Sequence, residues 1–579
     1  MRRGPALLAV CGVCVAGLSA QPPAPPVAPR DHRPPARAAA MDGDARVFGR
    51  VVDAFTGRPL RGAFVLAVPE RLPDGRAVTD RRDPHSQPIA MRTGDDGRFA
   101  LSDLAPGEYA LVARRSGYVQ QQLGQASPST PARRLRVQRG AVAGPIEFAL
   151  TPSGVISGRV LEATGAPAER ATVRALRVSY VDGVARLQPV TSAATDDLGE
   201  FRVFDLPPGS YILSAEPLKP FMLQDALAVR PSRDLVTTFA PSATSVAEAH
   251  MVTVAAGSEA AAHIHLIEAV VATVTGRVVD SLGAPMRGGY VTLQPRGLMR
   301  GLQGNRAPLQ AGGTFALHDV APGSYTIVAS PRFTGWTDEQ RDRQARSEAG
   351  TLDVEVDGDL GGLVIRTQPG TTVRGRLVVD GDASALRGRN IEVRATSMAS
   401  WGAGDHPIRD RVKPDLTFEL VGVRGPAVLR LGNAPDGWWT RAVRIGQVDA
   451  TDGHDFGTGR TVVATVVVST RRNGLRGRVS ASVHGPAHDA VIVGFDEDER
   501  LRARAVVSNT FMIRPVEDGS WSIDMLRPGA YRVVALPAAS VRGDDLGNPE
   551  YLRHLYARGR SVVIEEGHTP EIVLEVQEP

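Results

Sequence analysis

The sequence is poor in cysteine and lysine. Its 579 residues include two cysteines, Cys11 and Cys14, and both lie close to the N-terminus. If that segment is removed on export, the remaining chain has no disulfide, no thiolate zinc site and no cysteine nucleophile. Lys219 and Lys413 are the only lysines among 67 basic residues. Neither follows a glycine, so the Gly-Lys pair of a P-loop nucleotide site is absent.

The sequence also has none of the short motifs HExxH, GxSxG and GxGxxG that mark common catalytic and dinucleotide sites. The net charge is only +4, and acidic residues are interspersed with the arginines. Nucleic-acid binding needs clustered positive charge, so it is not expected. Beyond the N-terminal segment no apolar run approaches the length of a spanning helix. We expect no cofactor and no transmembrane segment in the mature chain.

The N-terminus has the features of a secretory signal peptide. Arg2 and Arg3 precede an apolar run, and Leu18-Ser19-Ala20 is a plausible cleavage site. We therefore predict a signal peptide over residues 1–20 and an extended linker, rich in proline and alanine, over 21–45. An exported protein of this kind resides in the periplasm, in the outer cell envelope or outside the cell.

What the sequence has in abundance is glycine (61) and proline (43), together with an internal repeat. The stretch DLAPGEYALVA at 103–113 has near-copies at 205–215, 319–329 and 525–535. Each is preceded, earlier in the chain, by a Gly-Arg-Val or Gly-Arg-Leu triplet. These triplets recur at intervals of about 100 residues, the size of one β-sandwich. Their glycines are Gly49, Gly158, Gly276, Gly375 and Gly477.

The period predicts five tandem domains. We place their boundaries at 46–151, 152–269, 270–368, 369–469 and 470–579, and call them units 1 to 5. The fourth is a degenerate copy.

In each unit an aromatic residue follows a turn and a Pro-Gly corner follows the aromatic. The aromatics are Phe99, Phe201, Phe315, Phe418 and Trp521. The corner pairs are Pro106-Gly107, Pro208-Gly209, Pro322-Gly323 and Pro528-Gly529. Ten residues after the aromatic come Tyr109, Tyr211, Tyr325 and Tyr531, with Val428 at that offset in unit 4.

Alternating apolar residues flank the corner on both sides, which is typical of half-buried strands. The sequence therefore predicts an all-β protein of five Ig-like or prealbumin-like sandwiches. We expect the tyrosine ring to pack in the core while its hydroxyl bonds the backbone near the corner. Unit 4 has Gly425-Pro426 and a polar Arg430 here, so its corner should be weaker or differently built. The best helix candidates are residues 337–348 and 549–558, and the first has almost no apolar face, which favours an exposed loop or a short helix there.

These motifs resemble the carboxypeptidase regulatory-like domain of bacterial exported proteins. The resemblance covers about residues 45–578 and implies a transthyretin-like sandwich, related to collagen-adhesin B-type repeats and the starch-binding-like fold. It implies no peptidase activity, because that domain is accessory in carboxypeptidases. B-type repeats often carry lysine–asparagine cross-links. None is expected here, since no predicted first strand contains lysine.

Two groups of polar residues could bind metal, but both have a plainer interpretation. His263 and His265 would project from one face of a strand, yet two ligands without a third favour a surface position. Acidic clusters at 95–96, 196–197 and 496–499 could bind calcium, but aspartate beside a glycine is favoured for turn geometry alone. No metal site is predicted.

Tryptophans give the strongest binding hint. Trp401, Trp438 and Trp439 all fall in unit 4, and Asp436 lies beside two of them. Sugar sites stack pyranose rings on aromatic side chains, and carboxylates bind the hydroxyls. On a strand, Trp438 and Trp439 would point to opposite faces, so one is expected in the core and the other at the surface.

Three functions remain open. The favoured one is a non-catalytic binding or scaffold protein of the cell envelope, with envelope proteins or polysaccharide as partners. The alternative is specifically a carbohydrate-binding protein that recognises polysaccharide. An enzyme with a site between domains is the third, and no motif supports it.

Overall fold

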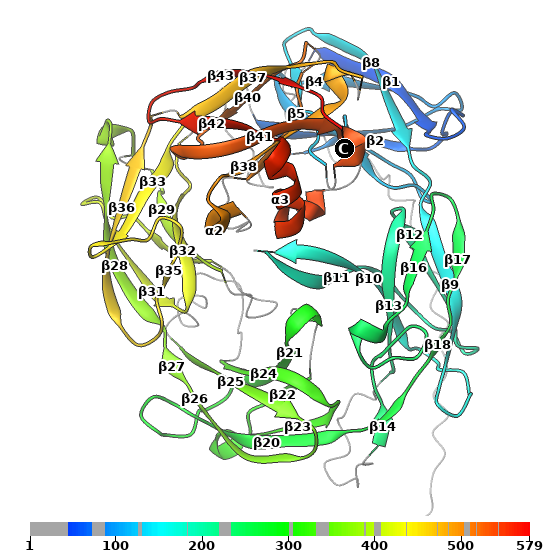
Figure 1. The fold of residues 1–579 in the computed structure, drawn as a ribbon, viewed down its shortest axis with the longest axis vertical. Coiled ribbons are helices and arrows are strands. Elements are labelled where there is room, and N and C mark those ends of the chain that lie inside the picture. The colour runs from blue at the N-terminus through cyan, green and yellow to red at the C-terminus, as the bar shows by residue number, and fades with distance from the viewer. Residues whose placement is uncertain are drawn as a thin grey trace, which may run out of the picture. The chain divides into compact units, whose positions relative to one another are not determined.

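The computed structural model describes residues 44–578 except 72–86, 126–129, 182, 219–232, 300–304, 332–346, 387–388, 399–406, 436, 472, 484–485, 503–509, 517 and 542. The regular secondary structure of the described chain is mostly β-strand, as predicted (Figure 1). The predicted signal peptide and all but two residues of the predicted linker lie outside the described residues.

Unit 1 shows the arrangement that the other units repeat. Strand β1 (Ala45–Asp53) lies at the centre of one sheet, antiparallel to β4 (Arg98–Leu104) and parallel to β8 (Val142–Leu150). The chain turns at the Pro-Gly corner between β4 and β5, and thereby leaves this sheet for the second one. The second sheet has the order β3 (Ile89–Arg92), β2 (Phe64–Arg71), β5 (Gly107–Arg114), β6 (Gln121–Gln122), and β7 (Leu135–Val137) also pairs with β5.

The other four units begin with the same three-strand pattern. Their first strands are β9 (Gly154–Leu161), β20 (Ala272–Val279), β28 (Thr371–Asp380) and β37 (Gly474–Ser480). Their antiparallel partners before the corner are β12 (Glu200–Leu206), β23 (Thr314–Val320), β31 (Thr417–Val423) and β40 (Ser520–Asp524). Their parallel partners are β17 (Glu259–Ala261) with β18 (Ile264–His265), β26 (Leu360–Arg366), β36 (Thr461–Ser469) and β43 (Glu571–Glu575).

The second sheets are built around the strand that follows the corner. These strands are β13 (Gly209–Glu216), β24 (Gly323–Ser330), β32 (Pro426–Gly432) and β41 (Gly529–Pro537). Each pairs antiparallel with β10 (Thr172–Val181), β21 (Tyr290–Pro295), β29 (Glu392–Ser397) or β38 (Ala490–Asp496), in that order.

Hydrophobic cores lie between the paired sheets. Five clusters of buried side chains span 45–150, 156–266, 272–365, 373–468 and 475–576. Each cluster falls inside one predicted range, except that Ala45 belongs to the first core although we predicted it as the last linker residue. The five boundaries themselves remain predictions.

The glycine of each Gly-Arg triplet lies directly opposite the repeat aromatic. The cross-strand pairs are Gly49–Phe99, Gly158–Phe201, Gly276–Phe315, Gly375–Phe418 and Gly477–Trp521. A Cβ added to Gly158 would lie 1.6 Å from the carbonyl oxygen of Ala262 on the neighbouring chain segment. The missing side chain of Gly158 thus leaves room for this carbonyl and for the Phe201 ring, whose Cε1 would lie 3.3 Å from the same Cβ.

Unit 5 carries an additional helical layer. Helix α3 (Pro549–Arg558) has the bounds that the sequence predicts, with Asn548 as its N-cap and proline in its first turn. Leu552 and Leu555 pack on the sheet face that points away from the sandwich core. As a result β38 is buried along its whole length.

Candidate functional site

Four units close the corner with a tyrosine hydroxyl. Each hydroxyl donates a hydrogen bond to the carbonyl oxygen four residues earlier. The oxygen distances are 2.9 Å for Tyr109–Ala105, 2.9 Å for Tyr325–Ala321 and 2.8 Å for Tyr531–Arg527, and Tyr211 bonds Pro207 in the same way. Burial raises the pKa of all four phenols, so they stay protonated donors at neutral pH.

A β-branched residue accompanies each tyrosine on the next strand. Directly opposite the corner glycine lie Val137, Val254, Val356 and Ile564, each no more than 3% exposed. Ring and β-branched side chain are diagonal neighbours on the inner face of the sheet, so together they fill the core under the corner.

Unit 4 differs, and it corrects our alignment. Ala427 and Leu429 belong to the core cluster, whereas Val428, which we placed at the tyrosine position, does not. The ladder agrees, because Leu429 pairs with Ala395 as Leu111 pairs with Ala67 in unit 1. The corner is one residue shorter here, and a one-residue slip turns every following side chain to the other face.

This slip explains the polar residue in unit 4. Arg430 lies on the outer face, where it donates to the carbonyl oxygens of Leu429 and Thr451. Burial lowers the pKa of its guanidinium to about 10, which still leaves it charged at neutral pH.

The aromatic ring of the unit 4 corner comes from the neighbouring strand. Phe456 is 1% exposed and occupies the place of Val137, while Ala427 occupies the place of Tyr109. The N–H of Phe456 donates to the carbonyl of Gly425 at 2.9 Å, and the N–H of Gly425 donates to Gly457 at 3.2 Å. This corner is thus closed by backbone hydrogen bonds rather than by a phenol.

Two residues of the proposed tryptophan site are buried. Trp438 and Trp439 are each 9% exposed, so neither offers a ring face to a sugar, and our expectation that one would lie at the surface is wrong. The reason is that Trp438 precedes β33 (Trp439–Ile445), so strand alternation does not apply to this pair. Trp439 donates its indole N–H to the carbonyl of Arg471 at 2.9 Å. Trp401 and Asp436 lie outside the described residues.

The other polar candidates have structural partners. His263 and His265 are exposed, and Nδ1 of His263 accepts the Arg159 N–H at 3.3 Å. Asp96 and Asp196 accept backbone N–H groups of their own turns. Within the residues that the structure describes, no group of three or more His, Asp or Glu side chains could hold a metal ion.

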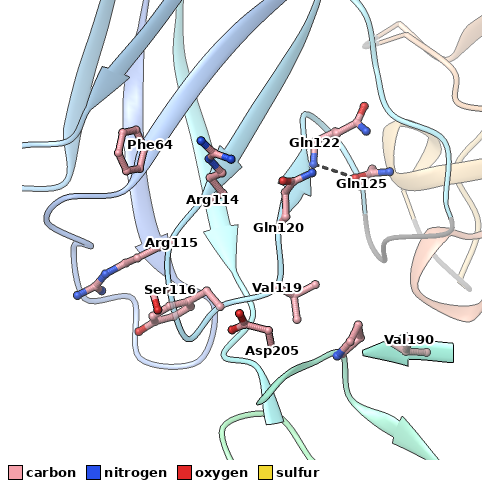
Figure 2. Close-up of a pocket in the computed structure, with 12 residues that line it drawn as sticks. Phe64, Arg114, Arg115, Ser116, Val119, Gln120, Gln122, Gln125, Val190 and Asp205 are labelled. Carbon is pink, nitrogen blue, oxygen red and sulfur yellow. Dashed lines mark hydrogen bonds between the residues drawn. The ribbon is translucent and has the colours of Figure 1, made fainter. Parts of the chain in front are cut away.

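A pocket in unit 1 was not anticipated from the sequence. Its volume is about 590 Å³, within the size range of small-ligand sites, and Figure 2 shows the side chains around it. Its lining from unit 1 is Phe64, Arg114, Arg115, Ser116, Tyr118, Val119, Gln120, Gln122 and Gln125. Val190, Asp205 and Pro207, which belong to unit 2, also line it.

The arginines at this pocket stack on aromatic rings. The guanidinium carbon of Arg114 lies 5.4 Å from the centre of the Phe64 ring, and that of Arg115 lies 5.3 Å from the Tyr118 ring. Arg92, on the strand at the sheet edge, stacks on Phe64 at 4.2 Å. These are cation–π distances, which hold the guanidinium planes in place.

The loop that carries Arg115 is anchored. The Tyr118 hydroxyl donates to Oδ2 of Asp53 at 3.0 Å, and Oδ1 of Asp53 accepts the N–H groups of Phe55 and Thr56. These N–H donors, Thr56 foremost, hold the pKa of Asp53 below its ordinary value. The sequence signal that could have drawn attention to this loop is the doublet in ARRSGY (113–118), which has no acidic neighbour.

Comparison with known proteins gives the class of these domains. Residues 46–150 and 155–220 match the family model of the carboxypeptidase regulatory-like domain. This match agrees with the resemblance that the motifs of units 1 and 2 carry, and units 3 to 5 repeat the strand pairing around the first strand and the corner. No curated protein matches the sequence.

Several solved structures share limited similarity with the chain. The minor pilin of Streptococcus agalactiae is 12% identical over 38% of this chain and 95% of its own, with a TM-score of 0.22. The major pilin subunit of Bacillus cereus is 12% identical over 56% and 99%, with a TM-score of 0.14. Two B repeat units of the Staphylococcus aureus collagen-binding protein are 12% identical over 73% and 99%, with a TM-score of 0.13. Similarities this weak say nothing about function.

Among the described residues no helix has the length and apolar character needed to cross a membrane.

Proposed function

We propose that the chain is a non-catalytic, exported binding and scaffold protein of the cell envelope. The observation that carries the proposal is what the repeat keeps from unit to unit. A glycine opposite an aromatic ring and a closed corner both serve the fold, and neither is a reactive group. Side chains that could bind a partner, such as the pocket arginines of unit 1, differ between the units.

Binding to envelope material tests this proposal. The purified chain is mixed with isolated bacterial envelopes and sedimented, with heat-unfolded chain as the control. We expect saturable co-sedimentation of the folded chain alone. A chain that stays in the supernatant at every concentration, or that binds equally when unfolded, would contradict the proposed function.

Polysaccharide recognition is the more specific form of this function. The buried Trp438 and Trp439 remove the basis on which unit 4 was chosen. The arginines and amides at the unit 1 pocket favour that unit instead.

A further inference from the structure

The unit 1 pocket has positive charge that the protein itself does not neutralise. Elsewhere on the sheets, arginines pair closely with carboxylates, as in Arg50–Glu147 at 2.6 Å and Arg159–Glu200 at 2.5 Å. In the described part of the chain no carboxylate lies within ion-pair distance of Arg92, Arg114 or Arg115. The guanidinium groups of Arg114 and Arg115 in the pocket lining, and that of Arg92 outside it, are therefore available to an external anion.

Sheet register brings two of these arginines together. Phe64 begins β2 and lies directly opposite Arg92 on β3 and opposite Arg114 on β5. The three side chains form a row across three strands on one face, since directly opposed residues point the same way. Like charges in such a row repel, and the intervening ring offsets part of that cost through cation–π contact. Arg92 and Arg114 are both exposed.

Stacking leaves the hydrogen-bonding edges of the guanidinium groups free. A stacked guanidinium uses its face, and its planar fork of N–H donors can still bind a carboxylate with two parallel hydrogen bonds. Because the stack restricts rotation, less conformational entropy is lost when the anion binds.

Neutral polar groups complete the pocket. Ser116, Gln120 and Gln122 line it, and in the described structure the side chains of Gln120 and Gln122 make no hydrogen bond. Amides can both donate to and accept from sugar hydroxyls. Asp205 also lines the pocket, and it can accept from a hydroxyl but repels a second negative charge.

We propose that this pocket binds a uronate unit of an acidic polysaccharide, with its carboxylate on Arg114 and its hydroxyls on the neighbouring amides. The assignment rests on the proposed binding function and names its ligand class. A uronate carries one charge and several hydroxyls, which matches a pocket with two arginines, several amides and one carboxylate.

The test is a calorimetric titration of the purified chain with oligogalacturonate. The variants are R114Q and R115Q, and the control is R98Q, which removes an exposed positive charge from the other sheet of the same unit. We expect saturable binding that weakens about tenfold in R114Q, the loss typical of one charge-assisted hydrogen-bonded pair. The loss in R115Q should be smaller, because that variant removes a charge at the pocket but no hydrogen bond to the carboxylate. The R98Q variant should bind like the parent. Unchanged circular dichroism and Tm in all three variants establish that they are folded.

Two further probes decide the chemistry. Fully methyl-esterified oligogalacturonate keeps the sugar and removes the charge, and we expect no binding. Poly-glutamate keeps the carboxylates and removes the hydroxyls, and we expect at least tenfold weaker binding. The proposal is overturned if oligogalacturonate does not bind, if R98Q weakens it as much as R114Q, if the ester binds, or if poly-glutamate binds equally well.

The same preparations are tested for co-sedimentation with envelopes, which separates the two proposals. Oligogalacturonate binding without envelope binding would contradict the envelope function and leave the pocket assignment in place. Envelope binding that survives in R114Q and R115Q, together with no oligogalacturonate binding, would overturn the pocket assignment alone.

Discussion

Units 2 and 4 close the same corner by different means. In unit 2 the ring of Tyr211 lies on the strand that follows the corner, and Val254 lies on the neighbouring strand. In unit 4 the neighbouring strand supplies the ring, Phe456, and the residue after the corner is Ala427. One large and one small side chain fill the space in both cases. The difference teaches that the fold needs the volume of a ring under the corner, and that the strand which supplies it can change.

The turns of unit 4 also have glycine and non-glycine residues at exchanged positions. The turn glycine before the aromatic has φ near 72° in units 1 and 2, at Gly97 and Gly199, whereas unit 4 has Leu416 there with φ 64°. Four residues after the aromatic, units 1 and 2 have Asp103 and Asp205 at positive φ, whereas unit 4 has Gly422. At Leu416, unit 4 thus has a residue with a side chain in a left-handed conformation that costs backbone strain. At Gly422 the strain of the aspartates in units 1 and 2 is absent, because glycine adopts positive φ freely.

The largest expected effect comes from removing the relocated ring. Phe456→Ala should lower the free energy of opening of unit 4 by about 3–5 kcal/mol, the usual cost of deleting a buried phenylalanine. Val254→Ala, at the equivalent place in unit 2, should cost only about 2 kcal/mol because it removes two carbons. Hydrogen exchange resolved by unit measures both, since a chain of several cores does not unfold in one step. Equal losses of stability in the two variants would contradict the conclusion that Phe456 supplies the large side chain of the unit 4 corner.

Alanine substitutions at two consecutive residues of β32, Leu429 and Arg430, test the one-residue slip in unit 4. Leu429→Ala should cost about 2–5 kcal/mol because the side chain is in the core. Arg430→Ala should cost about 1 kcal/mol, through two lost hydrogen bonds on the outer face. Hydrogen exchange in unit 4 measures which variant loses more stability. A larger loss of stability for Arg430→Ala would support the original alignment, in which Val428 takes the tyrosine position.

The phenol bond makes a smaller contribution. Tyr531→Phe removes a hydrogen bond of 2.8 Å to Arg527 and keeps the ring, so unit 5 should lose about 1 kcal/mol. Tyr211→Phe should cost more, because the hydroxyl also accepts from Nη2 of Arg177 at 2.7 Å. Exchange protection of β41 and β13 reports each change. A Tyr211→Phe variant as stable as the parent would show that the hydroxyl contributes nothing.

The smallest effect is a pH dependence confined to unit 1. The pKa of Asp53 is lowered in the folded state, so its contribution to stability is present above the ordinary carboxyl value of 3.8 and is lost as the pH falls below it. The Asp53→Asn variant should therefore be less stable than the parent at pH 7 and differ less at pH 3. Exchange protection of β1 at the two pH values measures this. A difference that grows on acidification would contradict the assignment.

The spacing of the motifs predicts the repeat architecture well, because each glycine and aromatic residue of the motif pair directly across two neighbouring strands. Every Gly-Arg glycine faces the aromatic that the spacing pairs with it, as in Gly477–Trp521. The helix over 549–558 was also predictable, since proline and an asparagine cap mark its start. These features depend on residue types whose backbone preferences are strong.

The remaining features depend on non-local geometry. A fixed offset from Phe418 placed Val428 at the tyrosine position, and Arg430 two residues later was the one sign against that phase. The shortened corner itself is visible only in the pairing of β32 with β29. Both tryptophans of the Trp438-Trp439 pair are buried because the strand begins between them. The pocket arginines were missed because Arg92, Phe64 and Arg114 meet only through the pairing of three strands.

The most direct test exchanges the two side chains of the unit 4 corner. The single variants A427Y and F456V should each destabilise unit 4, the first by overpacking and the second by a cavity. The double variant A427Y/F456V restores the arrangement of unit 2, and its loss of stability in hydrogen exchange should be smaller than that of either single variant, a favourable coupling of about 1 kcal/mol or more. Additive losses would show that the two positions do not share one space, and would contradict the account.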